Sequence, residues 1–367
     1  MTTRVAINGF GRIGRAFVRR SQGRDIEIVA INDLGSLENL AYLLKYDTVY
    51  GRAPFEVGYS EQVIGDSKGA NTLLIGGKEV KFFSEKDPAN LPWAELGIDV
   101  VVESTGFFTE YEKAQAHIEA GAKRVVISAP ATEKIIGNRE QGIVNSTTTY
   151  NLQPTTSDLG ATVLMGVNED KIATCKITSN ASCTTNAASP VIAILDDALG
   201  IEKAILSTAH GYTASQSIVD GPSKKDMKEG RAGAQNIVPT STGAAIAVTK
   251  AFANLENKFD GVSLRVPVAA GSIADVTFIA KRNTTKEEVN DILRAASKDA
   301  KWEGIFKTTD EELVSSDIVG EPWASIADLG MTRVVDGNLV KVLAWYDNEM
   351  GYTESLVRHV LKAGQQE

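Results

Sequence analysis

Two residues of the chain, Cys183 and His210, have the types and settings of a nucleophile and its proton partner. Cys183 follows a small polar run, residues 179–182, and precedes an apolar stretch, residues 187–199, that predicts a helix. At a helix amino terminus, unpaired N–H groups and the helix dipole stabilise a thiolate, so we expect a lowered pKa for this thiol. His210 ends a strand-like run. The pattern predicts that Cys183 attacks an electrophile while His210 exchanges its proton.

The remaining thiol and imidazoles receive other assignments. The chain has only two cysteines and three histidines. Cys175 lies in the strand-like run 174–178 and fits a structural role or simple exposure. His117 lies beside an apolar stripe of a predicted helix and His359 lies on the polar side of the last helix, so we expect both at the surface. The spacings match no zinc pattern, and we predict no metal site.

A glycine-rich turn, Gly9, Gly11 and Gly14, has the pattern G-x-G-x-x-G between a predicted strand and a predicted helix. Glycine here permits a tight turn and close approach to a pyrophosphate, whose charge lies at the helix amino terminus. Asp33 ends the next strand, where a carboxylate accepts a hydrogen bond from a ribose hydroxyl. Because this charge would repel the extra phosphate of NADP, the pattern predicts NAD. The alternative is a packing loop with an aspartate in a nearby turn.

Two kinds of sheet are needed to position these residues. Before residue 131, short β-branched runs at 4–7, 26–31, 100–104 and 124–128 alternate with helical stretches, one of them over 109–120 and ended by Gly121. This alternation is typical of βαβ units around a parallel sheet. After Cys183, apolar and polar residues alternate over 274–280, as in a sheet with two different faces. Thr284 and Glu287 predict a capped helix towards residue 297, and another helix follows Thr353.

We therefore predict an α/β fold, with a Rossmann dinucleotide-binding domain plus an α+β catalytic domain that contains a mixed or antiparallel sheet. The expected first domain spans 1–182 and is completed by the C-terminal helix, 349–367. The expected catalytic domain spans 183–348. Residues 131–160 are rich in Ser, Thr, Asn and Gly, which predicts an insertion within the first domain.

Composition argues against several classes of protein. The 367 residues carry 47 acidic and 38 basic side chains, a formal net charge of −9, without a basic run that would follow a nucleic-acid backbone. No apolar run approaches the ~20 residues of a membrane span, and the amino terminus lacks the pattern of a signal peptide. Two cysteines are too few for a disulfide framework. We expect a cytoplasmic protein that binds neither nucleic acid nor membrane.

Four motifs together resemble the phosphorylating, NAD-dependent glyceraldehyde-3-phosphate dehydrogenase family. They are NGFGRIGR at 8–15, IND at 31–33, SCTTN at 182–186 and WYDNE at 345–349, in the order of the family. The resemblance covers nearly the whole chain apart from the insertion. It implies a glycolytic oxidoreductase in which Cys183 attacks the aldehyde, oxidation by NAD gives a thioester, and inorganic phosphate releases 1,3-bisphosphoglycerate.

The resemblance also implies binding residues. Thr213 and Arg265 would hold the substrate phosphate, and the attacking phosphate would be held by Ser182, Thr184, Thr242 and Gly243. The cofactor contacts, beyond the three glycines and Asp33, would be Arg12, Ile13, Lys86, Ser128 and Asn348, the last of which bonds the nicotinamide carboxamide. The loop 220–226 resembles one that packs beside the cofactor of a neighbouring subunit, which implies a homotetramer.

Two other functions fit parts of the pattern. A relative that oxidises erythrose 4-phosphate would use the same cysteine and histidine on a longer aldehyde. A regulatory protein that binds NAD without turnover would use Cys183 as an oxidisable switch. That second function explains Asp33 and Cys183 but leaves His210 and Arg265 without a purpose.

Overall fold

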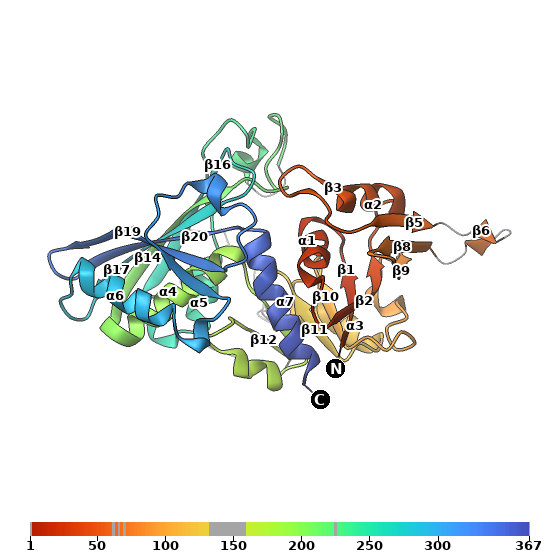
Figure 1. The fold of residues 1–367 in the computed structure, drawn as a ribbon, viewed down its shortest axis with the longest axis horizontal. Helices are drawn as coiled ribbons and strands as arrows, with labels where there is room; N and C mark the ends of the chain where they lie inside the picture. Colours follow the sequence, from red (N-terminus) through yellow and green to blue (C-terminus); the bar gives the residue numbers. More distant parts are fainter. Residues whose placement is uncertain are drawn as a thin grey trace, which may run out of the picture.

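The computed structural model describes residues 2–60, 63–64, 67–68, 71–131, 159–223 and 226–366. Two large sheets form two lobes, and the long helix α7 (Met350–Gly364) lies between them (Figure 1). Most of the expected insertion, residues 132–158, lies outside the described residues, as do residues 224–225 of the loop expected at a subunit contact.

The first sheet is mainly parallel, as the alternating pattern predicted. Its strand order is β12-β13-β11-β10-β1-β2-β9-β8-β5, and every pair from β12 to β9 is parallel. The four expected strands are confirmed, each with ends shifted by at most one residue. The strands are β1 (Thr3–Asn8), β2 (Ile26–Asn32), β5 (Val57–Ser60), β8 (Asn71–Ile75), β9 (Lys78–Phe83), β10 (Val100–Glu103), β11 (Arg124–Ile127), β12 (Gly160–Thr162) and β13 (Ile177–Ser179).

Helices α1 (Arg12–Ser21), α2 (Leu37–Lys45) and α3 (Tyr111–Glu119) belong to the first lobe. The predicted helix over 109–120 is confirmed as α3, and Gly121 follows it with φ +102°. Helix α7 begins at Met350, one residue after the start of the C-terminal helix expected over 349–367. It packs against α1, β10 and β11, and its buried Glu354 forms ion pairs with arginines of the first lobe. A buried carboxylate with such partners fixes α7 in place, because losing one partner would leave a charge uncompensated.

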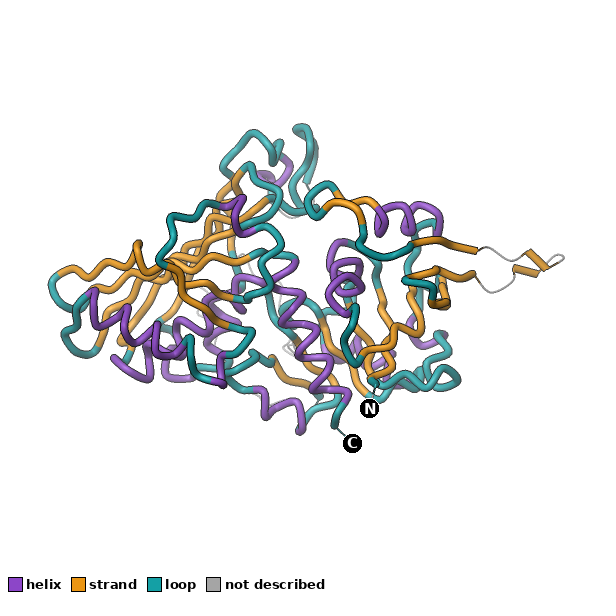
Figure 2. The backbone as a smooth tube through the Cα atoms, viewed as in Figure 1, coloured by secondary structure: helices purple, strands orange, loops and turns teal. Residues whose placement is uncertain are grey.

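The second sheet is mixed, with strand order β15-β16-β14-β17-β20-β19-β18. Strand β17 shows the predicted two faces, since Ala274, Val276 and Phe278 are buried and the residues between them are partly exposed. Helices α4 (Cys183–Leu199), α5 (Ala244–Thr249) and α6 (Lys286–Ala296) lie along one face (Figure 2). The strands are β14 (Ile201–Gly211), β15 (Val238–Ser241), β16 (Phe259–Val266), β17 (Ser272–Ala280), β18 (Phe306–Thr309), β19 (Ser325–Val335) and β20 (Leu339–Tyr346).

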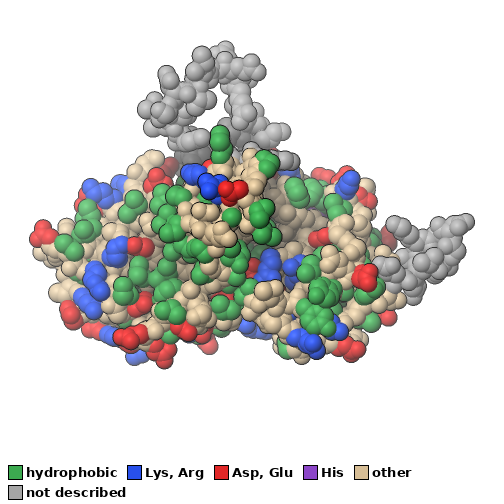
Figure 3. Space-filling model, turned by 90° about the horizontal axis from the view of Figure 1, so that it is seen from above, with side chains coloured by type: hydrophobic (Ala, Val, Ile, Leu, Met, Phe, Trp, Pro, Cys, Tyr) green, Lys and Arg blue, Asp and Glu red, His purple; other side chains and the backbone are tan. Residues whose placement is uncertain are grey.

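Several smaller features complete the fold. The N-cap of α6 is Thr285 rather than the expected Thr284, which instead bonds the side chain of Glu288. Two short hairpins extend from the first lobe, β3 (Tyr46–Asp47) with β4 (Gly51–Arg52), and β6 (Val63–Ile64) with β7 (Ser67–Lys68). Within the described residues, no helix is long and apolar enough to cross a membrane. On the face in Figure 3, acidic and basic side chains are interspersed.

Candidate active site

Cys183 is the first residue of α4, as the sequence predicted. The N-cap is Ser182, whose hydroxyl oxygen accepts the amide of Thr185 at 3.1 Å. Ala181, just before the cap, has φ +54°, a left-handed conformation that costs a non-glycine residue energy and is often found at functional sites. The surrounding structure therefore holds the turn before α4 in a strained conformation. This turn fixes the position of Cys183.

The structure brings His210 to this cysteine. His210 lies near the end of β14, and its Nε2 is 3.2 Å from Sγ of Cys183. Its Nδ1 is 2.7 Å from the carbonyl oxygen of Gly211 and 2.6 Å from Nη1 of Arg265. Because a carbonyl only accepts, the Gly211 contact favours a proton on Nδ1, which leaves the Nε2 lone pair facing the thiol.

Arg265 favours the opposite tautomer, because its guanidinium only donates. With the proton on Nε2, His210 would accept from Arg265 and donate to a Cys183 thiolate. In both arrangements one proton lies between Sγ and Nε2. The contact of Nδ1 with Gly211 therefore fits the thiol form of Cys183, and its contact with Arg265 fits the thiolate form. In the thiolate form, Arg265 supplies the compensating positive charge.

The electrostatics of the free site differ from our expectation. As a residue Cys183 is only partly buried, but desolvation of its thiol raises the pKa above the usual range. Arg265 and the amide and hydroxyl of Thr184 offset part of this increase. The predicted lowering was wrong because the sequence shows the helix start but not the burial around it. Burial and the charge of Arg265 lower the pKa of His210 to about 3. Both groups are therefore neutral near pH 7 in the free protein.

The expectation that the other two histidines lie at the surface was also wrong. His117 and His359 are both 0% exposed. His117 accepts from the indole of Trp93 at 3.1 Å and donates to Glu103 at 3.0 Å. His359 bonds Thr178 and Asn180. Each histidine meets another element that supplies hydrogen-bond partners, a long-range packing that a helical pattern does not reveal.

The glycine-rich turn has the shape that a dinucleotide requires. Gly9 has φ +95°, and a Cβ there would lie 2.6 Å from the amide nitrogen of Thr105. A Cβ on Gly14 would lie 2.3 Å from the carbonyl oxygen of Gly9, so α1 packs closely on β1. A Cβ on Gly11 would meet nothing within 4 Å, and Gly11 caps α1 without a side-chain bond. This open cradle over free helix amides fits the pyrophosphate of NAD.

Three more of the expected cofactor residues lie at the same edge of the first sheet, because the carboxyl ends of its parallel strands meet there. Asp33 follows β2, and its carboxylate accepts the amides of Phe10 at 2.6 Å and Gly35 at 2.8 Å. Ser128 follows β11. Lys86 is exposed and follows β9, in a segment held by two hydrogen bonds between the Asn32 side chain and the Glu85 backbone.

Arg12 and Ile13 open α1, next to the cradle. The guanidinium of Arg12 forms ion pairs with the carboxylates of Asp47 and Glu349. Glu349 directly follows Asn348. The ion pair therefore joins the glycine-rich turn to the segment that carries the expected nicotinamide ligand.

The expected phosphate ligands surround the Cys183–His210 pair unevenly. Arg265, on β16, lies opposite His210 in the parallel register. Ser182 and Thr184 flank the cysteine, and the Thr184 hydroxyl is turned to the Tyr346 hydroxyl at 2.8 Å.

Thr213 follows the end of β14 and bonds Ser215 and Gln216. Thr242 and Gly243 connect β15 to α5, which packs against α4. Of the expected ligands, Arg265, Ser182 and Thr184 thus lie directly beside the pair.

Sequence reasoning missed two buried hydroxyls of the second sheet. Tyr346 lies between the hydroxyls of Thr184 and Thr208, and its ring meets His210 edge-on. Ser272 accepts the amide of Gly211 and donates to Asn348. Their signal in the sequence is a polar residue at an inward position of a strand whose other inward residues are apolar.

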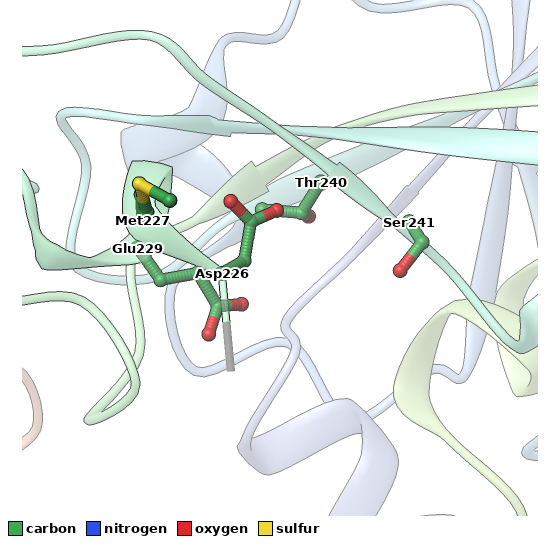
Figure 4. Close-up of a pocket in the computed structure, with 5 residues that line it drawn as sticks. All are labelled: Asp226, Met227, Glu229, Thr240 and Ser241. Atoms are coloured by element: carbon green, nitrogen blue, oxygen red, sulfur yellow. The ribbon is translucent and has the colours of Figure 1, made fainter. Parts of the chain in front are cut away.

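A cavity of about 600 Å³ lies beside β15 (Figure 4). Asp226, Met227, Glu229, Thr240 and Ser241 line it, whereas Cys183 and His210 do not. Two carboxylates in the lining disfavour a phosphate there. In the parts of the chain that the structure describes, no group of three or more His, Cys, Asp or Glu side chains is arranged to hold a metal ion.

Comparison with known proteins agrees with this geometry. Residues 3–111 match the family model for the glyceraldehyde 3-phosphate dehydrogenase NAD binding domain, and residues 182–348 match the model for the C-terminal domain. The chain is 44% identical over 370 residues to glyceraldehyde-3-phosphate dehydrogenase of Streptomyces coelicolor, with 100% of both chains covered. It is 45% identical over 372 residues to the enzyme of the same name from Mycobacterium avium, with 99% of both covered. These matches confirm the predicted fold class and NAD as cofactor, and the chain belongs to the glyceraldehyde-3-phosphate dehydrogenase family.

Proposed function

We propose that this protein oxidises D-glyceraldehyde 3-phosphate to 1,3-bisphosphoglycerate with NAD and inorganic phosphate, using Cys183 as nucleophile and His210 as proton partner. The observation that carries the proposal is the 3.2 Å contact between Sγ and Nε2 at the amino terminus of α4. A regulatory protein without turnover needs no such base, and it leaves the contact between Arg265 and His210 unexplained.

The neutral resting pair suits this reaction. As Sγ bonds the aldehyde carbon, Nε2 of His210 takes the thiol proton and returns it to the carbonyl oxygen, which gives a hemithioacetal. The α4 amides and the charge of Arg265 stabilise the sulfur while it carries negative charge. His210 then takes the hydroxyl proton as the thioester forms. NAD, when bound, supplies the hydride acceptor for this step. Inorganic phosphate attacks the thioester, and Cys183 leaves as a thiolate.

Two anion sites complete the proposal. Arg265 and Thr213 hold the substrate phosphate, and the inorganic phosphate binds at Ser182, Thr184, Thr242 and Gly243. The Nε of Arg265 is buried without a hydrogen-bond partner among the described residues, which supports an anion ligand for this guanidinium. On the cofactor side, Gly9, Gly11, Gly14 and Asp33 are joined by Arg12, Ile13, Lys86, Ser128 and Asn348.

The test is the formation of NADH from glyceraldehyde 3-phosphate, with and without inorganic phosphate, by the wild type and by Cys183→Ser. We expect phosphate-dependent turnover that the substitution abolishes. Erythrose 4-phosphate in the same assay separates the alternative substrate, which would have to give the higher kcat/KM to replace the triose. Binding of NAD without turnover of either aldehyde would favour the regulatory function instead.

We also propose a cytoplasmic homotetramer whose first domain comprises 1–182 and 349–367, with 183–348 as the catalytic domain. The packing of α7 against α1 and the first sheet supports this division. Apolar side chains exposed on β14 and β16 support association, since Ile205 is 54%, Val262 47% and Leu264 36% exposed. A contiguous apolar face of this kind is typical of a protein contact.

A further inference from the structure

Ser272 links the strand end that carries the catalytic histidine to the expected nicotinamide ligand. It lies at the start of β17 and is 1% exposed. Its oxygen accepts the amide of Gly211 at 3.0 Å, and its hydroxyl donates to Oδ1 of Asn348 at 2.8 Å. Gly211 is the residue whose carbonyl oxygen contacts Nδ1 of His210. One buried hydroxyl thus joins the two halves of the site.

The direction of these bonds defines the orientation of the Asn348 amide. An amide N–H only donates, so the Gly211 contact leaves the hydroxyl proton of Ser272 free for Asn348. If the amide were reversed, its NH₂ would face Ser272, and the hydroxyl proton would lack this acceptor in a buried position. Such an unpaired group is costly. The hydroxyl therefore holds Oδ1 of Asn348 and leaves the NH₂ group for a ligand.

The backbone of Asn348 is fixed separately. The preceding carboxylate, Asp347, accepts the amides of Glu349 at 2.8 Å and Met350 at 2.9 Å, the hydroxyl of Tyr50, and the amide of Gly320. Loss of the Ser272 hydroxyl would leave this turn in place. What it would release is the rotation of the Asn348 amide group.

We propose that Ser272 is a positioning residue that selects which end of the Asn348 amide faces the carboxamide of bound nicotinamide. The inference rests on the proposed function, in which Asn348 bonds that carboxamide. With Ser272 present, the NH₂ group of Asn348 donates to the carboxamide oxygen. Without it, the amide can turn and present its oxygen, which only a ligand with its own N–H can satisfy.

Two dinucleotides distinguish the two orientations of the Asn348 amide. NAD has a carboxamide, whereas its 3-acetylpyridine analogue has the carbonyl oxygen but no NH₂ group. The measurement is the dissociation constant of each for the cofactor-free protein, by calorimetry. We expect Ser272→Ala to weaken binding of the analogue about tenfold more than binding of NAD, a factor of the size of one buried hydrogen bond. The matched control is Ser325→Ala, because Ser325 is also buried in this sheet but its hydroxyl has no hydrogen-bond partner among the described residues.

The ratio of the two constants compares ligands within one variant, so a general loss of stability leaves it unchanged. An unchanged ratio in Ser272→Ala overturns the inference. If that variant fails to fold, Ser272→Cys, whose S–H is a weak donor, must shift the ratio in the same direction. Failure of the wild type to bind NAD would instead refute the proposed function.

Discussion

The guanidinium of Arg265 lies 2.6 Å from Nδ1 of His210, on the side of the imidazole away from Cys183. The two residues are direct partners in the parallel pairing of β14 with β16, so their contact is set by strand register. The charge of Arg265 adds to the effect of burial in lowering the pKa of His210, and it offsets part of the effect of burial in raising the pKa of Cys183. A phosphate bound to this guanidinium would offset that charge. Substrate binding would then make His210 more basic when a base is needed.

Replacing Arg265 by Ala should act mainly through the substrate phosphate. A charge-assisted hydrogen bond contributes about 1.5–3 kcal/mol, so we expect kcat/KM for glyceraldehyde 3-phosphate to fall about 10–100-fold. Unphosphorylated glyceraldehyde should show a much smaller loss. Steady-state kinetics with both aldehydes checks this, with Arg333→Ala as control, because that exposed arginine bonds backbone carbonyls of β19. Equal losses for both aldehydes would contradict a phosphate ligand.

Replacing His210 by Asn should remove the base while keeping a polar side chain. A positioned imidazole contributes about 10²–10⁴-fold as a general acid or base, and kcat should fall by that factor. Affinity for NAD should not change, because His210 is not one of the expected cofactor ligands. Initial rates and NAD titrations separate the two effects. Wild-type turnover in the variant would exclude His210 as the proton partner.

Local patterns predicted the positions of Cys183 and His210 well. The polar run before an apolar helix placed Cys183 at the start of α4, and a strand end placed His210 at the edge of the second sheet. Both are properties of short segments. Their separation of 3.2 Å depends on the packing of α4 on the sheet, and the sequence suggested it only because a helix-terminal cysteine needs a partner.

The errors concern quantities set by residues distant in sequence. His359 lies on the polar side of its helix, yet Thr178 and Asn180 cover it. The raised pKa of Cys183 is also set by residues distant in sequence, because burial of the thiol outweighs the effect of the helix amino terminus on its pKa. Ser272 is polar at an inward strand position, and its role depends on partners at Gly211 and Asn348.

Replacing Asp33 by Ser should weaken the preference for NAD. The carboxylate lies at the end of β2, where it accepts two loop amides and is available to a ribose hydroxyl. We expect the KM for NAD to rise about tenfold, as for loss of a charge-assisted bond, while kcat/KM for NADP increases because the repelling charge is gone. Kinetics with both cofactors gives the ratio. A ratio unchanged from the wild type would place the selecting charge elsewhere.

Placing charges on the exposed face of β16 should break the proposed tetramer. Burying a carboxylate in an apolar contact is costly, so the double substitution Val262→Asp and Leu264→Asp should give smaller particles. Light scattering after size-exclusion chromatography measures their mass. Val335→Asp, on an exposed residue of β19, is the control and should keep the wild-type mass. An unchanged mass in the double variant would show that this face is not the contact.

Acid should destabilise the protein through histidines that are neutral in the folded state. Burial lowers the pKa of His359 to about 3, and burial with the charge of Arg265 does the same for His210. A histidine in the unfolded chain has a pKa of about 6.5. Between these values the unfolded chain binds protons that the folded chain does not. The free energy of unfolding should therefore fall as pH decreases from about 6.5 towards about 3, by about 1.4 kcal/mol per pH unit for each histidine.

His359→Gln should remove one of these contributions. Urea titrations between about pH 4.5 and about pH 6.5 should give a pH slope smaller than that of the wild type by about 1.4 kcal/mol per unit. Thr178→Val is the matched control, because it deletes a partner of His359 and lowers stability but leaves the titrating group in place. If His359→Gln and Thr178→Val have the same slope as the wild type, His359 is not held neutral by the fold.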